Sequence, residues 1–197
     1  MKSKRWGLAV VWLVFGLRAA FADDTGYKNP ATAAGQFTNP GNVASSNDAR
    51  AVEGTVGDTM ACWDFSFNLP ADAQSINGIL IEAEGRLLES PPQGGGSTAD
   101  LQIRLSWNGG TNWTSAKTDL YTDGEGEFYH GFGGSADTWG RSWTVTETNN
   151  ANFRVSLKYS REDISQDQIE IDHLRAKIFY TPASGGSSPR RARLFKK

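Results

Sequence analysis

The sequence predicts an all-β protein, a single antiparallel β-sandwich of jelly-roll type, from three observations. Its apolar stretches are short and alternate apolar with polar residues, which is the pattern of half-buried strands. Turn-forming residues cluster between these stretches, as in 91–97 and 108–111. No segment keeps an apolar period of 3.6 residues, so no long amphipathic helix is expected. Two sheets packed face to face bury one side of many such strands at once.

The expected strands cover residues 63–67, 76–83, 101–107, 143–145, 153–159 and 174–180. In the first of these, Trp63 shares a face with Phe65, which places both in the core; Trp107 has the same position in its own strand. In the last, Asp172 is in phase with the apolar residues. We therefore expect a buried carboxylate held by backbone or arginine donors. His173 is out of phase with them and is expected at the surface.

The chain divides into four parts. Residues 1–22 combine a basic start, an apolar run of 11 residues and an Ala-x-Ala site, which predicts a signal peptide and a secreted or cell-surface protein. Residues 23–36 are rich in Gly, Asn and Ala, and we expect a flexible N-terminal segment there. The β-sandwich domain is placed at 37–181. Residues 182–197 join a Gly/Ser linker to a basic tail.

Charge and composition exclude several classes of function. The 197 residues carry a net charge of −2, but residues 23–188 hold 11 basic and 22 acidic residues, a net −11. Such an acidic body disfavours nucleic acid as a partner. No apolar run is long enough for a membrane span. The single cysteine, Cys62, excludes an internal disulfide; we expect it to be buried, with pairing between chains as the alternative.

An acidic segment is the candidate metal site. Carboxylates spaced around glycines are able to converge on Ca²⁺, which prefers oxygen ligands on flexible loops. The candidate ligands are Asp119, Asp123, Glu125 and Glu127. The spacing lacks the start of an EF-hand loop, and a solvated acidic hairpin explains the pattern more simply. No other cofactor is indicated.

Loop aromatics are the candidate ligand-binding residues. Trp113 follows a turn, and Tyr129 and Phe132 lie in a second aromatic loop, 127–134. Exposed rings at these positions would stack on a sugar or another apolar partner. The alternative is that each ring folds over its own hairpin.

Five stretches carry a resemblance to a known domain. They are FTNPGNVASSNDARAV (37–52), FSFNLPADAQSINGILIEAEG (65–85), GGSADTWGRSWT (133–144), NANFRVSLKY (150–159) and IEIDHLRAKIFYT (169–181). In this order they resemble a β-sandwich domain of secreted bacterial surface proteins and of phage or phage-like structural proteins. The resemblance implies a structural or adhesive module in an extracytoplasmic or virion-surface setting, and it implies no catalytic residues.

Two functional hypotheses follow, and neither is enzymatic. The first is a secreted structural subunit or decoration of an extracellular filament, sheath or surface assembly, whose partner is itself or another surface protein. In that hypothesis residues 23–36 add a strand to the sheet edge of a neighbour. The alternative is a carbohydrate-binding or adhesive module that uses the loop aromatics, with or without calcium. A hydrolase is not expected, because the two histidines lie near no nucleophile elbow and Glu82 and Glu84 share a solvated strand face.

Overall fold

The computed structural model describes residues 22–88, 96–162 and 167–183. The expected signal peptide, apart from its last residue, and the basic tail lie outside these ranges. Within them, no helix has the length and apolarity that a membrane crossing requires.

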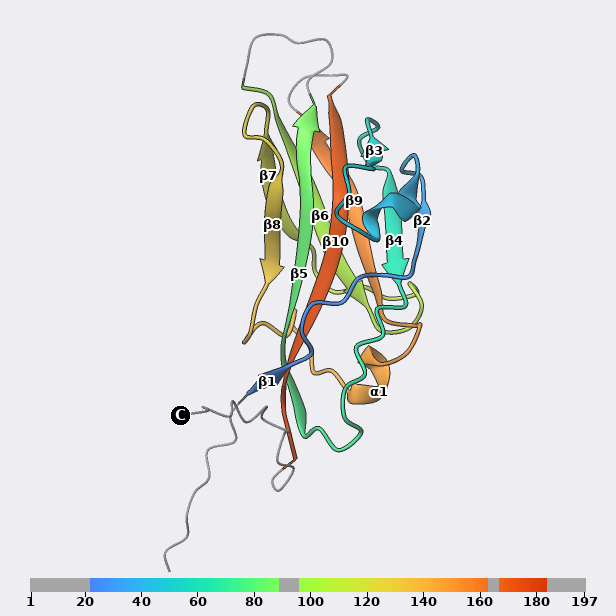
Figure 1. Cartoon of the computed structure of the whole chain (residues 1–197), viewed down its shortest axis with the longest axis vertical. Helices are drawn as coiled ribbons and strands as arrows, with labels where there is room; N and C mark the ends of the chain where they lie inside the picture. Colours follow the sequence, from blue (N-terminus) through green and yellow to red (C-terminus); the bar gives the residue numbers. More distant parts are fainter. Residues whose placement is uncertain (1–21, 89–95, 163–166, 184–197) are drawn as a thin grey trace, which may run out of the picture.

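The described residues form two antiparallel sheets packed as a sandwich, which confirms the predicted fold class (Figure 1). The first sheet has the order β1-β10-β5-β8, with β3 also paired to β10. Its strands are β1 (Asp23–Asp24), β3 (Ala51–Glu53), β5 (Ser75–Leu88), β8 (Phe128–Gly133) and β10 (Gln168–Thr181). The second sheet has the order β2-β4-β9-β6-β7. Its strands are β2 (Thr32–Gly35), β4 (Thr59–Trp63), β6 (Thr98–Ser106), β7 (Lys117–Thr122) and β9 (Arg154–Glu162).

The core lies between the two sheets and follows the predicted alternation. In β5, Ile79 and Ile81 are fully buried, while Leu80 and Glu82, which alternate with them, are only partly buried. Leu101, Ile103 and Leu105 of β6 are likewise fully buried and belong to the same apolar cluster. Each such side chain contributes about 1.5–3 kcal/mol through burial. This core fixes which residues of each strand face solvent.

The expected strand 63–67 ends early. β4 stops at Trp63, and the next residues alternate through left-handed backbone, with φ of 62° at Asp64 and 51° at Ser66. These kinks turn Phe65 and Phe67 into the core, although Trp63 lies on the outer side of the sheet and is only half-buried. The prediction that Trp63 is a core residue was therefore wrong.

Residues 143–145 also differ from the expected strand. A short helix, α1 (Val145–Thr148), begins here instead. Its start is a capping box, in which the Thr144 side chain accepts from the Glu147 backbone N–H and the Glu147 carboxylate accepts from the Thr144 N–H. A second short helix, the 3-10 helix η1, covers Pro40–Val43.

A β-bulge in β10 changes the alternation at Asp172. Ile171 pairs with Gly85 and His173 with Glu84, so Asp172 is the extra residue between them. Asp172 is buried, and its carboxylate accepts from the Asn47 backbone N–H, as expected. His173 is also buried, so its expected surface position was wrong, because strict alternation does not anticipate a bulge.

Residues 23–36, expected to be flexible, belong to both sheets instead. β1 pairs with the end of β10, Lys28 bridges to Ala176 of the same strand, and β2 pairs with β4 in the other sheet. The segment therefore crosses from one sheet to the other along one side of the sandwich (Figure 1). The strand that the self-assembly hypothesis would donate to a neighbour is already paired within its own chain.

Candidate functional site

The structure does not bring together the four carboxylates of the expected calcium site, Asp119, Asp123, Glu125 and Glu127. Asp119 instead accepts a contact of 2.9 Å from Nδ1 of His130, and Glu127 pairs with Arg50. Among the described residues, no group of three or more potential ligands is arranged to hold a metal ion. Two of the four expected ligands therefore have other partners in the structure, and calcium binding by this segment stays a prediction.

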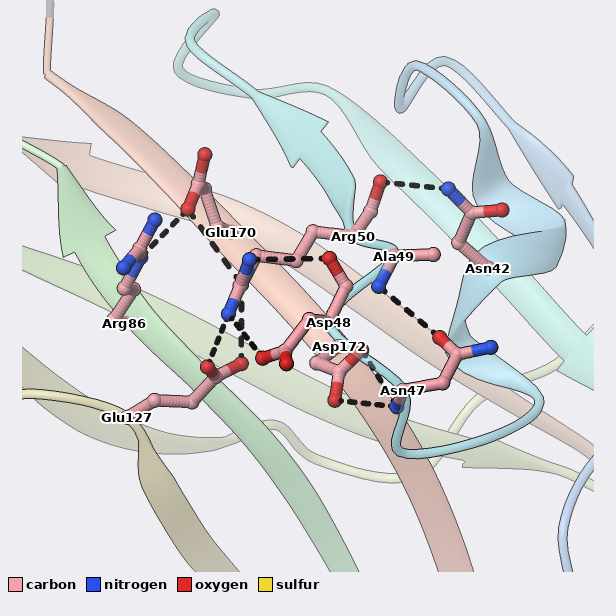
Figure 2. Close-up of polar contacts among 9 residues, drawn as sticks. All are labelled: Asn42, Asn47, Asp48, Ala49, Arg50, Arg86, Glu127, Glu170 and Asp172. Atoms are coloured by element: carbon pink, nitrogen blue, oxygen red, sulfur yellow. Dashed lines mark hydrogen bonds and ion pairs between the residues drawn. The ribbon is translucent and has the colours of Figure 1, made fainter.

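The ion pairs of Arg50 hold the loop before β3 onto the first sheet (Figure 2). Arg50 Nη2 contacts Asp48 Oδ1 at 2.9 Å and also binds Glu127, and Arg50 Nε lies 3.7 Å from Glu170 Oε2. Arg86 donates to the same Glu170 oxygen at 2.7 Å. The hydrogen bond to Glu127 raises the pKa of the guanidinium further. These charges are mutually satisfied, which favours a structural role for this network.

Two of the three expected ligand-binding aromatics lie in the first sheet. Phe132 is only 2% exposed and packs in the core, so it offers no ring to a ligand and that expectation is corrected. The hydroxyl of Tyr129 lies 2.8 Å from Nδ1 of His173, and the guanidinium carbon of Arg175 lies 3.7 Å from its ring centroid. Internal partners thus engage both the hydroxyl and a ring face of Tyr129.

The outer face of the second sheet is defined by the alternation of β4, β9 and β6. In these strands one set of side chains is buried in the core: Met60, Cys62, Val155, Leu157, Ile103 and Leu105. The residues between them therefore point away from the core. Cys62 belongs to the buried set, and burial raises the pKa of its thiol.

An aromatic and cationic row crosses this outer face. Trp63 pairs with Arg154 on the neighbouring strand, and Arg154 pairs with Ser106. The guanidinium carbon of Arg154 lies 4.4 Å from the Trp63 ring centroid. Trp113 lies at the far end of the row: a Cβ built on Gly110 would stand 3.3 Å from Cζ2 of Trp113 and 3.9 Å from Cδ of Arg154. The Gly110 N–H donates to the Ser106 hydroxyl at 2.9 Å, which fixes this turn beside β6.

A row of short side chains lies beside this first row. Ala34 of β2 pairs with Ala61 of β4, Ala61 with Ser156 of β9, and Ser156 with Arg104 of β6. A third row, parallel to it, contains Thr59, Lys158 and Gln102. Short side chains on three neighbouring strands thus lie between two rows of longer ones, and Arg104 ends their row on β6.

The sequence indicated part of this surface. Trp113 was a predicted ligand-binding residue, and it folds beside Arg154 while remaining half-buried. The alternation also predicted that Arg104 and Arg154 point away from the core. It did not predict that they lie close together, because alternation within a strand carries no information on the register between strands. Trp63 was missed because the left-handed residues after it reverse the apparent phase.

Comparisons with known proteins add only distant likenesses. No family model and no curated protein matches the sequence. A structure described as "CBM4 structure and function" has a TM-score of 0.38 at 10% identity, over 67% of this chain and 72% of that one. The CBM22-1 xylan-binding domain from Paenibacillus barcinonensis Xyn10C scores 0.34 at 9%, over 85% and 100%. TmCBM61 in complex with beta-1,4-galactotriose scores 0.32 at 11%, over 79% and 86%. These values are too low to carry a function from those proteins to this chain.

Proposed function

We propose that this protein is a non-catalytic glycan-binding module whose ligand lies across the outer face of the second sheet. The observation that carries the proposal is the row formed by Trp63, Arg154 and Trp113. Two indoles lie at the surface of one sheet, with hydrogen-bonding side chains between and beside them, and a sugar ring binds through these two kinds of group. The apolar face of the sugar packs on an aromatic ring, and its hydroxyls meet polar groups.

The rows beside it provide the remaining contacts. The short side chains of Ala34 and Ala61 form a low strip between the longer rows. Lys158 and Gln102 line the other side of that strip, where an ammonium and an amide are suitable partners for hydroxyl groups. Because neighbouring strands are about 5 Å apart, the strip is long enough for an extended oligosaccharide to contact several strands.

Both histidines have structural partners, which supports a non-catalytic module. His130 lies between the sheets, stacked on Tyr121 with ring centroids 3.7 Å apart and bound to Asp119. His173 is buried under the loop before β3 and contacts Tyr129. Neither ring lies on the outer face of the second sheet.

The proposal is tested by measuring binding of the full chain to a panel of soluble polysaccharides, by affinity electrophoresis and then calorimetry. We expect Trp63→Ala and Trp113→Ala each to weaken the best binding by about tenfold or more, since each removes a stacking surface worth more than about 1.4 kcal/mol. Tyr27→Ala is the matched control, because Tyr27 is a 38% exposed aromatic over the first sheet. Each variant's melting temperature shows whether it is folded.

The proposal would be overturned if the protein bound no glycan, or if Trp63→Ala and Trp113→Ala bound the glycan as tightly as the wild type. It would also be overturned if Tyr27→Ala lost as much glycan affinity as the two tryptophan variants.

A further inference from the structure

The cations at the centre of the candidate surface lack ionic partners. Arg104, Arg154 and Lys158 form no ion pair with any side chain in the described ranges, and the guanidinium of Arg154 lies over the Trp63 ring. In addition, Arg154 Nε is buried without a hydrogen-bond partner among the described groups. These are three of the 11 basic residues in the acidic body of the protein.

The outer face of the first sheet is built differently. Its arginines are all ion-paired: Arg50 and Arg86 bind Glu170, and Arg175 binds Glu82 at 2.6 Å. A protein with twice as many acids as bases in its body has ample carboxylates for pairing. On the first sheet Lys177 has no ion pair in the described ranges and lies over the rings of Tyr27 and Phe179, whereas on the second sheet three unpaired cations are neighbours in one cluster.

The acids nearest to this surface are hydrogen-bonded to other groups. They lie immediately before and after β4 and near the start of β6. Their partners are Gln36 for Asp58 at 2.7 Å, Thr32 for Asp64 at 3.2 Å, and Arg161 for Asp100 at 2.9 Å. None of these acids forms an ion pair with the three central cations.

The three cations surround one serine. Arg154 and Lys158 lie two residues before and after Ser156 on β9, and Arg104 is directly opposite Ser156 on β6. In this geometry each cation is about 5–7 Å from Ser156 at the backbone level. Like charges at this spacing repel one another, and a bound anion would remove that repulsion.

We infer that the glycan carries carboxylate groups and is a polyuronate, with one carboxylate held between Arg154, Arg104 and Lys158. This inference rests on the proposed function, because Trp63 provides the stacking surface for the sugar ring that bears the carboxylate. The planar fork of an arginine matches a carboxylate in two parallel hydrogen bonds. Three cations, with acids immediately before and after the neighbouring β4 and near the start of β6, suit one carboxylate per sugar better than the denser charge of a sulfated polymer.

The test uses the full chain with polygalacturonate, the same polymer with its carboxyl groups reduced to alcohols, dextran sulfate and duplex DNA. Buffers contain no divalent ions. We expect polygalacturonate to bind at least tenfold more tightly than the reduced polymer, with affinity that falls as salt rises. Arg104→Gln and Lys158→Gln should each remove most of this difference. Lys177→Gln, a cation on the outer face of the first sheet, is the matched control and should leave it unchanged.

The outcomes separate the inference from the proposed function. Equal affinity for the reduced polymer, still lost in Trp63→Ala, overturns the acidic ligand and leaves glycan binding in place. Equal or tighter binding of dextran sulfate or DNA overturns the choice of a polyuronate. Failure to bind either form of the polymer, or any other glycan, overturns both statements.

Discussion

The guanidinium carbon of Arg154 lies 4.4 Å from the ring centroid of Trp63, and the two residues are directly paired on neighbouring strands. Arg154 therefore lies over one face of the Trp63 indole, and the proposed sugar contact uses the part of this half-buried ring that remains exposed. Because the charge of Arg154 has no carboxylate partner among the described residues, this contact is its main interaction within the protein. The pair is at once a packing contact and the centre of the proposed binding surface.

Replacing Arg154 with alanine should lower stability only slightly, but it should expose the Trp63 ring to solvent. A cation–π contact at an exposed site contributes about 0.5–1 kcal/mol, so the free energy of unfolding should fall by roughly that amount. Chemical denaturation measures it, and a red shift of tryptophan emission would report the uncovered indole. Arg161→Ala, which removes an arginine paired with Asp100, controls for loss of a surface charge. Unchanged emission in Arg154→Ala would show that the two side chains are not stacked in solution.

The sequence predicted the sandwich because the alternation in 101–107, 153–159 and 174–180 reports core burial directly. It failed where backbone geometry departs from a regular strand. The left-handed residues after Trp63 and the bulge at Asp172 both change the phase of the pattern without changing its composition. The candidate surface was only partly predictable for another reason. Its rows depend on strand register between segments far apart in the chain, which periodicity within one segment does not contain.

Gly78 of β5 packs tightly against the connection between β8 and α1, so we expect Gly78→Ala to destabilise the fold. A Cβ at Gly78 would stand 2.2 Å from the carbonyl oxygen of Gly134, so the backbone has to move to accept Gly78→Ala. Overpacking of this kind costs roughly 1–3 kcal/mol or more. Gly134→Ala is the matched control, because nothing lies within 4 Å of its Cβ position. Equal melting temperatures for the two variants would mean that the two segments do not pack as the structure has them.

Pairing of the N-terminal segment is tested at Lys28. Its N–H donates to the carbonyl oxygen of Ala176 at 2.8 Å, and it accepts from the N–H of the same residue. Proline at position 28 removes the donor and leaves a carbonyl of β10 unpaired, so Lys28→Pro should lower the free energy of unfolding by about 1–3 kcal/mol. Lys28→Ala keeps the backbone donor and should be close to wild type. A Lys28→Pro protein as stable as Lys28→Ala would show that the segment is free, as the strand-donation hypothesis requires.

Acid sensitivity should originate in part at His173. Burial lowers the pKa of this ring, while the charges of Glu84 and Asp172 act in the opposite direction and that of Arg175 adds to the lowering. The folded protein therefore binds a proton at His173 less readily than the unfolded chain does. Its contribution to stability is fully present above the unfolded pKa, about 6.5, and is lost as pH falls from there through the folded pKa.

The contact with Tyr129 gives this titration a structural consequence. The Tyr129 hydroxyl lies 2.8 Å from Nδ1 of His173, and a neutral ring accepts its proton there, whereas a protonated ring has no lone pair to accept it. Melting temperatures measured from pH 8 to pH 5 should fall for the wild type. They should fall less for His173→Gln, which keeps an acceptor for Tyr129 and does not titrate. The variant lacks the titrating ring, so its melting temperature should depend less on pH. Parallel curves for the two proteins would assign the acid sensitivity to other groups.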